Sequence, residues 1–97
     1  MSELRAIFGM SLQVALLGAV SPSLRAVSIR KRDDQAIIFF YYDGPISEED
    51  RESASTVETE LLADLYPEHP FTVELVRLDM PAALPRADFR VYHRREN

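Results

Sequence analysis

The stretch QAIIFFYYD, residues 35–43, is the feature of this sequence that most constrains its fold. Every residue from Ala36 to Tyr42 is apolar or aromatic, which is typical of a strand that is buried on both faces. Such a strand needs other strands beside it and other elements over its faces. The sequence therefore predicts a layered protein built around a central strand.

The segment before this run predicts the neighbour of the central strand. In residues 24–32, the apolar Val27 and Ile29 alternate with basic side chains such as Arg30, which is the period of a half-buried strand. An Asp-Asp pair at residues 33–34 follows and suits a tight turn. The two segments are therefore expected to form a hairpin.

Periodicity and capping signals predict the remaining elements. Ser47 fits the N-cap of a helix, because its hydroxyl can accept a hydrogen bond from an amide one turn later, and Pro67 ends that helix. The expected elements are a helix from Ser2 or Glu3 to Leu17, strands at 24–32 and 35–43, a helix from Ser47 to Tyr66, and strands at 71–79 and 89–94. Residues 1–97 are expected to form a single α+β domain in α-β-β-α-β-β order, with both helices packed on a four-stranded antiparallel sheet.

The first helix is expected to be buried in the core. Its apolar residues recur at three- and four-residue spacings over a broad face. They are Leu4, Ile7, Phe8, Met10, Leu12, Val14, Ala15, Leu16 and Leu17. Glu3 precedes the apolar stretch, and Ser11 and Gln13 interrupt it. The stretch is also shorter than the roughly 20 apolar residues that span a bilayer. A core helix is therefore favoured over a signal peptide or membrane anchor.

The second helix combines an apolar stripe with strong acidity. The stripe consists of Ala54, Val57, Leu61 and Leu65, widened by Leu62 and Tyr66 toward the C-terminal end. The acidic residues are Glu48, Glu49, Asp50, Glu52, Glu58, Glu60 and Asp64, and Arg51 is the only base. Seven acids minus one base leave this helix at −6, whereas the whole chain carries −5. The excess negative charge of the chain therefore lies on this helix.

These acids fall into two groups. Those at 48–52 lie in the first turn, where the helix dipole favours negative charge. Glu58, Glu60 and Asp64 lie farther along, where exposed helices usually mix signs to form i to i+4 pairs. Glu60 and Asp64 are instead like charges four residues apart. We therefore expect a basic protein to bind this helix, and the net charge argues against nucleic acid or an anionic membrane as partner.

The sequence indicates neither catalytic nor metal-binding chemistry. It contains no cysteine, which excludes disulfides, thiolate metal ligands and thiol nucleophiles and suits a reducing cytoplasm. His69 and His93 have no visible partner residue, and no catalytic motif or phosphate-binding glycine loop is present. The acids at 48–52 fan around their helix rather than converge on one ion. We expect a cytoplasmic protein that is not an enzyme and binds no metal or cofactor.

The basic residues raise an alternative. They are Arg25, Arg30, Lys31 and Arg32 on the first hairpin and Arg90, Arg94 and Arg95 near the C-terminal end. Together they could form a positive patch that binds RNA, with Tyr41, Tyr42 and Tyr92 as stacking groups. The net charge opposes RNA binding, and arginines on exposed strand faces are common, so a solvated sheet face is expected instead.

Three phrases of the sequence resemble a known class of proteins. LLGAVSPSLRAVSI, FFYYDGPISEEDRESASTVETELLADLY and VRLDMPAALP are similar to segments of small acidic immunity proteins from contact-dependent growth-inhibition or related polymorphic toxin systems. The resemblance covers roughly residues 12–86. It implies a cytoplasmic protein that binds the C-terminal toxin domain of its cognate partner and blocks the active site. Such toxins are often nucleases, whose active sites are basic because they hold phosphate.

The charge pattern and the resemblance together predict a protein-binding surface. Its candidate residues are Glu48, Glu49, Glu52, Glu58, Glu60, Asp64 and Asp43, with Tyr41, Tyr42 and Tyr66 as aromatic anchors. Each tyrosine has an alternative role in packing the sheet or helix. The leading hypothesis is a monomeric or weakly dimeric immunity protein that neutralises a basic toxin domain, such as a nuclease. The alternative is an acidic adaptor or regulatory module that could dimerise.

Overall fold

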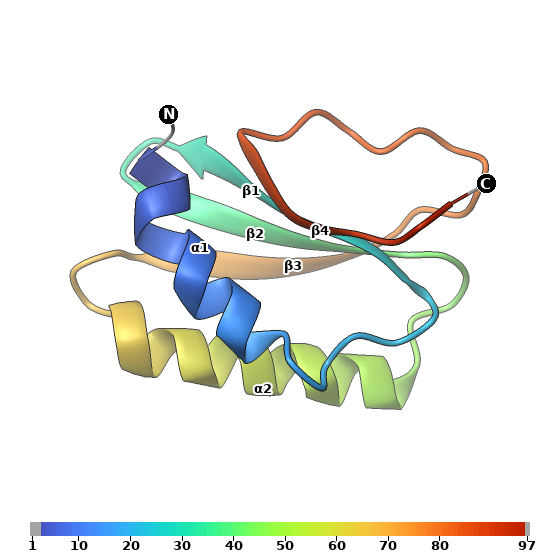
Figure 1. Ribbon diagram of the computed structural model, residues 1–97, viewed down its shortest axis with the longest axis horizontal. Helices are drawn as coiled ribbons and strands as arrows, with labels where there is room; N and C mark the ends of the chain where they lie inside the picture. The colour runs from blue at the N-terminus through green and yellow to red at the C-terminus, as the bar shows by residue number, and fades with distance from the viewer. Residues whose placement is uncertain (1–2, 97) are drawn as a thin grey trace.

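Two helices and four strands follow one another along the chain, and the computed structural model describes residues 3–96 (Figure 1). They are α1 (Glu3–Ala15), β1 (Leu24–Arg32), β2 (Gln35–Tyr42), α2 (Glu48–Leu65), β3 (Phe71–Arg77) and β4 (Phe89–His93). The predicted α+β class and element order are confirmed, and β1 has the predicted bounds. No helix in this described range is both long enough and apolar enough to cross a membrane.

Strand β2 lies inside the sheet, as its apolar run predicts. The strand order is β3-β2-β1-β4, and β1 pairs antiparallel with β2 and with β4. β2 and β3 are parallel, from Ala36 opposite Phe71 to Tyr42 opposite Arg77. The sheet is therefore mostly antiparallel, and the expected antiparallel pairing fails only for this pair. The reason is that α2 carries the chain back along the sheet before β3 begins.

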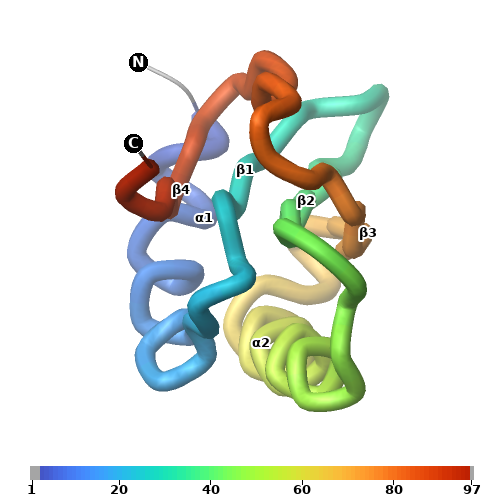
Figure 2. The backbone as a smooth tube through the Cα atoms, turned by 90° about the vertical axis from the view of Figure 1, so that its right-hand side faces the viewer, coloured from blue at the N-terminus to red at the C-terminus, as the bar shows by residue number. Residues whose placement is uncertain are grey.

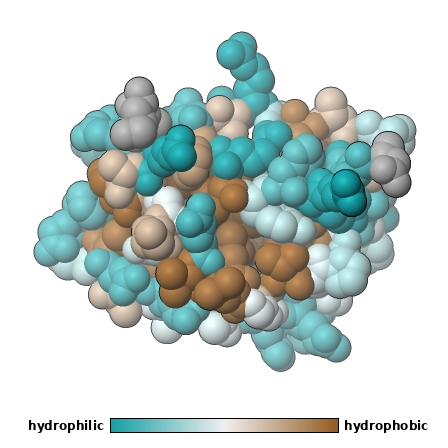
Figure 3. All heavy atoms as spheres, viewed as in Figure 1, coloured by the Kyte–Doolittle hydropathy of each residue, from teal (hydrophilic) through white to brown (hydrophobic). Residues whose placement is uncertain are grey.

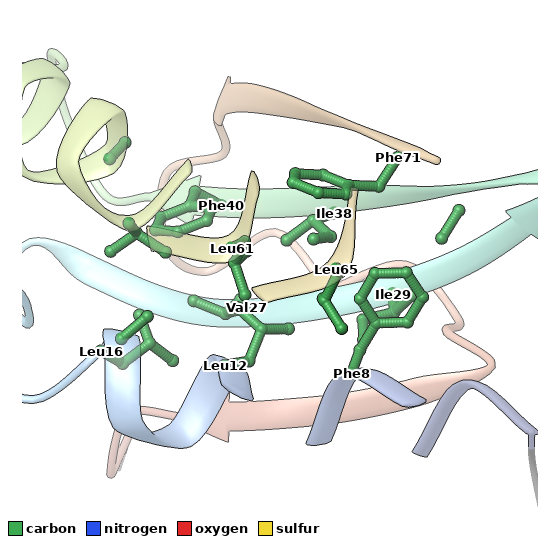
Figure 4. Close-up of a cluster of buried hydrophobic side chains, with 14 of the residues drawn as sticks. Phe8, Leu12, Leu16, Val27, Ile29, Ile38, Phe40, Leu61, Leu65 and Phe71 are labelled. Carbon is green, nitrogen blue, oxygen red and sulfur yellow. The ribbon is translucent and has the colours of Figure 1, made fainter. Parts of the chain in front are cut away.

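Both helices pack on the same face of the sheet, and the core lies between them and the strands. Figure 2, which looks along the strands, shows α1 and α2 on one side of the sheet. Figure 4 shows side chains from α1, the sheet and α2 pointing toward one another. Phe8 of α1 meets Phe71 of β3 edge-on, with ring centroids 6.0 Å apart. The stripe predicted for α2 belongs to this core, since Ala54, Val57, Leu61 and Leu65 are buried.

Two expectations about helix burial are wrong. The face of α1 that meets the core carries Leu4, Phe8, Leu12 and Ala15. Met10, Val14 and Leu17, which were also expected in the core, are exposed. Leu62 and Tyr66 are likewise exposed instead of widening the buried stripe of α2. A single helical layer on one face of a sheet gives each helix one face against the core, and the opposite face meets solvent.

The segment between β3 and β4 lies on the other side of the sheet. Arg25 Nη1 donates to the carbonyl oxygen of Leu78 at 2.7 Å, and Arg90 Nη2 donates to that of Pro85 at 2.6 Å. Figure 1 shows this segment arching above the strands, whereas α2 lies below them and α1 runs downward in front of them. The helical side and this side therefore present different surfaces to a partner.

Candidate protein-binding surface

Ser47 is the N-cap of helix α2, as the sequence predicts. The backbone N–H of Asp50 donates to Ser47 Oγ at 3.0 Å, and Ser23 Oγ donates to Asp50 Oδ2 at 2.9 Å. Burial alone would raise the pKa of the Asp50 carboxyl, but hydrogen bonds from Ser21, Ser23 and Ser47 outweigh it and hold that pKa below its usual range. Asp50 is therefore a buried structural acid that anchors the start of the helix.

The other acids of α2 face solvent. Glu48, Glu49, Glu52, Glu60 and Asp64 are exposed, and Glu58 is partly buried. Within residues 3–96, none of these six side chains takes part in an ion pair. Their negative charge is therefore not neutralised by a neighbour in the folded chain, although water and salt screen it.

Asp43, which lies outside α2, differs from these acids because it has an ion-pair partner. Arg94 Nη2 lies 3.2 Å from Asp43 Oδ2, and the backbone N–H of Met80 donates to Asp43 Oδ1 at 3.2 Å. The partly buried Asp43 was predicted to contact a partner, and the structure gives it partners within the chain. Its charge is less available to another protein than the charges of α2.

Glu58, Glu60 and Asp64, the acids beyond the first turn of α2, do not all lie on the same flank of the helix. Glu60 and Asp64 face α1 across a groove of about 260 Å³. The groove is lined by Ser11, Val14 and Ala15 of α1 and by Glu60, Ala63 and Asp64 of α2. Glu58 shares a different flank of α2 with Leu62 and Tyr66, because residues four apart lie one above another on a helix. Two of the three acids thus border one groove, and the third does not.

Of the three candidate tyrosines, the structure leaves only Tyr66 at the surface. Tyr66 is 60% exposed, whereas Tyr41 and Tyr42 are 4% and 2% exposed. Tyr42 belongs to the core, and burial raises the pKa of its hydroxyl to about 12. Tyr41 stacks on Phe39, with ring centroids 5.8 Å apart. The packing role that the sequence left open therefore accounts for Tyr41 and Tyr42.

A further apolar surface was missed from the sequence. Met10, Val14 and Leu17 are 72%, 57% and 79% exposed. In Figure 3, hydrophobic residues gather over the C-terminal half of α1 and the turn after it. The signal that could have revealed this surface is the apolar character of the helix almost all round, since a helix lying on a sheet can bury only one face.

One of the basic residues that would form a positive patch for RNA binding is not at the surface. Arg25 is buried, and its Nε lies 2.8 Å from Glu96 Oε2. Arg30, Lys31 and Arg32 remain exposed and, with Ile37 and Phe39, line a hollow of about 130 Å³. In addition, Tyr41 and Tyr42 are too buried to stack on bases. The hairpin arginines are therefore left without most of the aromatic groups that RNA stacking needs.

Metal binding finds no support in the arrangement of side chains. Over the residues that the structure describes, no three His, Cys, Asp or Glu side chains are grouped so that they could hold a metal ion. The exposed features of the helical side are thus the unpaired acids of α2 and the apolar residues of α1, which suit contact with a protein.

Comparison with known families supports contact with a protein. A family model described as MafI2 immunity protein matches residues 5–96. The chain belongs to this family. No curated protein matches it. The resemblance inferred from the sequence is thereby confirmed at the level of an immunity protein, and membership implies that the chain binds and neutralises a toxin. The narrower relation to contact-dependent growth inhibition stays a prediction.

Proposed function

We propose that this immunity protein neutralises its cognate toxin by binding a basic surface of the toxin domain with helix α2. The observation that carries the proposal is the concentration of charge, −6 on α2 against −5 for the whole chain. All the acids of α2 except the buried Asp50 are exposed or partly exposed and lack ion-pair partners within residues 3–96. Complementary charge accelerates the association of two proteins and suppresses wrong partners. An acidic helix is therefore suited to capture a basic toxin quickly.

The toxin class that best fits this surface is a nuclease, acting in the cytoplasm where its nucleic acid lies. A site that holds phosphate needs basic side chains, and arginine and lysine supply them. An acidic helix seated on such a site would occupy the place of the substrate backbone. The proposed contacts are Glu48, Glu49, Glu52, Glu58, Glu60 and Asp64, with Asp43 at the margin and Tyr66 as the exposed tyrosine.

Co-expression tests this function directly. Cells that produce the C-terminal domain of the toxin encoded immediately upstream should stop growing, and this chain should restore growth. The two purified proteins should form a stable complex on size exclusion. If the chain neither restores growth nor forms that complex, the proposed function is wrong. Cleavage of DNA or RNA by the toxin domain alone, blocked by this chain, would identify the nuclease class.

A further inference from the structure

Exposed apolar side chains are unevenly distributed over this protein. Among the residues that the structure describes, the large apolar side chains that are exposed are Met10, Val14, Leu17, Val20, Leu62, Tyr66 and Met80. Four of these seven lie on α1 or within the five residues that follow it. Figure 3 shows hydrophobic residues gathered in this region. We name Met10, Val14 and Leu17 the α1 stripe.

The α1 stripe lies on the side of the helix opposite the core. Phe8 and Leu12 point inward, Met10 and Val14 lie four residues apart on the outward side of α1, and Leu17 is exposed in the turn that follows the helix. The fold gains little from apolar side chains there, because they remain in contact with water. A contiguous exposed apolar patch on a soluble chain usually marks an interface.

The α1 stripe meets the acidic surface at the groove between the helices. Val14 belongs to the stripe and also lines the groove, opposite Glu60 and Asp64 of α2. An apolar area is thus bordered on one side by two negative charges that have no ion-pair partner among residues 3–96. Protein interfaces have this anatomy, with an apolar centre and a polar rim.

We propose that the toxin domain docks on the α1 stripe and the adjoining groove, with apolar side chains over Met10, Val14 and Leu17 and a lysine or arginine beside Glu60 and Asp64. This proposal rests on the proposed function and adds where the binding energy arises. The negative charge on α2 speeds the encounter with the toxin. Removal of the α1 stripe from water then stabilises the bound complex. The flank of α2 that carries Glu58, Leu62 and Tyr66 lies outside the contact centre.

A basic partner fits this surface better than a second copy of the chain. A two-fold dimer through the α1 stripe would bring the same patch of both molecules together. Glu60 and Asp64 of one copy would then lie close to those of the other, and like charges at an interface oppose association. The net charge of −5 on each copy adds to this repulsion. In the proposed function the toxin surface is basic, so it attracts Glu60 and Asp64 instead of repelling them.

Two matched double variants test the proposal. The stripe variant carries Met10→Gln and Leu17→Gln, and the control variant carries Met80→Gln and Leu62→Gln. Both replace one exposed methionine and one exposed leucine and leave the charge unchanged. Binding kinetics to the C-terminal domain of the upstream toxin would be measured for the full chain and both variants. Circular dichroism and thermal unfolding would show that all three proteins are folded.

The stripe variant should bind at least about 30-fold more weakly than the wild type, mainly through faster dissociation, because apolar anchors at the centre of an interface determine its lifetime. The control variant should stay within about threefold of the wild type, as expected for residues outside the contact centre. If the stripe variant binds as tightly as the wild type, or if the control variant is the weaker of the two, the proposed docking surface is wrong.

The same measurements separate this proposal from the proposed function. Tight binding of the wild type with no effect of the stripe variant leaves toxin neutralisation in place and overturns only the docking surface. Absence of wild-type binding overturns both. Sedimentation of the wild type alone adds a further check. If the wild type is a dimer and the stripe variant is a monomer, the α1 stripe binds a second copy of the chain. That result would contradict the proposal that the toxin occupies it.

Discussion

At the scale of single residues, Glu96 connects the C-terminal end of the chain to the sheet. Its carboxylate lies 2.8 Å from Arg25 Nε and 3.0 Å from Arg94 Nη2. Arg25 is buried, and its Nη1 donates to the carbonyl oxygen of Leu78. The hydrogen bond from Arg25, followed by that from Arg94, lowers the pKa of Glu96 from 4.5 to about 2. The carboxylate thus joins β1 to the C-terminal residues, and Arg25 extends the connection to the segment after β3.

We predict that Glu96→Gln lowers the free energy of unfolding at pH 7 and that this difference shrinks on acidification. A carboxyl whose pKa is lower in the folded chain stabilises it above the unfolded pKa, near 4.5, and loses that effect as the pH falls toward about 2. Urea unfolding of both proteins at pH 7, 4 and 2.5 checks this. A difference between the two proteins that is constant with pH would contradict the lowered pKa.

At the scale of elements, α2 has two acidic flanks with different neighbours. Glu60 and Asp64 border the groove beside α1, whereas Glu58 shares the opposite flank with Leu62 and Tyr66. Because no side chain within residues 3–96 forms an ion pair with Glu60 or Asp64, changing them should disturb the fold little. These two acids therefore allow charge at the proposed contact to be altered without a large loss of stability.

We predict that Glu60→Lys with Asp64→Lys slows association with the toxin domain by about tenfold or more at low salt and weakens its salt dependence. The matched control is Asp34→Lys with Glu74→Lys, which reverses two exposed acids outside α2. Both variants have a net charge of −1, from −5 plus 4. Stopped-flow association across a salt series would compare them. Equal slowing by both variants would show that overall charge, not α2, steers the toxin.

At the scale of the whole molecule, the two sides of the sheet carry different surfaces. The helical side presents the α1 stripe and the acids of α2, and the other side presents the segment between β3 and β4 (Figures 1 and 2). The rest of the chain has a charge of +1, from −5 minus −6. A basic toxin is therefore expected to engage one side of the molecule only.

We predict that binding of the toxin domain slows amide hydrogen exchange in α1, in the turn at residues 16–20 and in α2. A bound partner stabilises the elements that it covers against local opening. Residues 78–88, on the other side of the sheet, should exchange at the same rate with and without the toxin. Hydrogen exchange measured by mass spectrometry on the free chain and the complex provides the comparison. Protection confined to residues 78–88 would contradict the assignment of the helical side.

Local features allowed much of the fold to be predicted. The alternation in residues 24–32 marked β1, the apolar run at 36–42 marked the central strand, and Ser47 marked the start of α2. The concentration of acids on α2 was also readable, because the chemistry and spacing of neighbouring residues do not depend on the rest of the chain. The sequence therefore predicted which elements form and which helix carries the charge.

Only the tertiary structure decided how those elements face one another. It made β2 and β3 parallel, turned Met10 and Val14 of α1 outward, and placed Glu60 and Asp64 beside α1. It also paired Arg25 with Glu96 across 71 positions of sequence. Periodicity shows that a helix has an apolar face, but the elements packed against it determine how much of that face is buried. The sequence thus determined an acidic helix on an α+β sheet, and packing decided where its charge meets the α1 stripe.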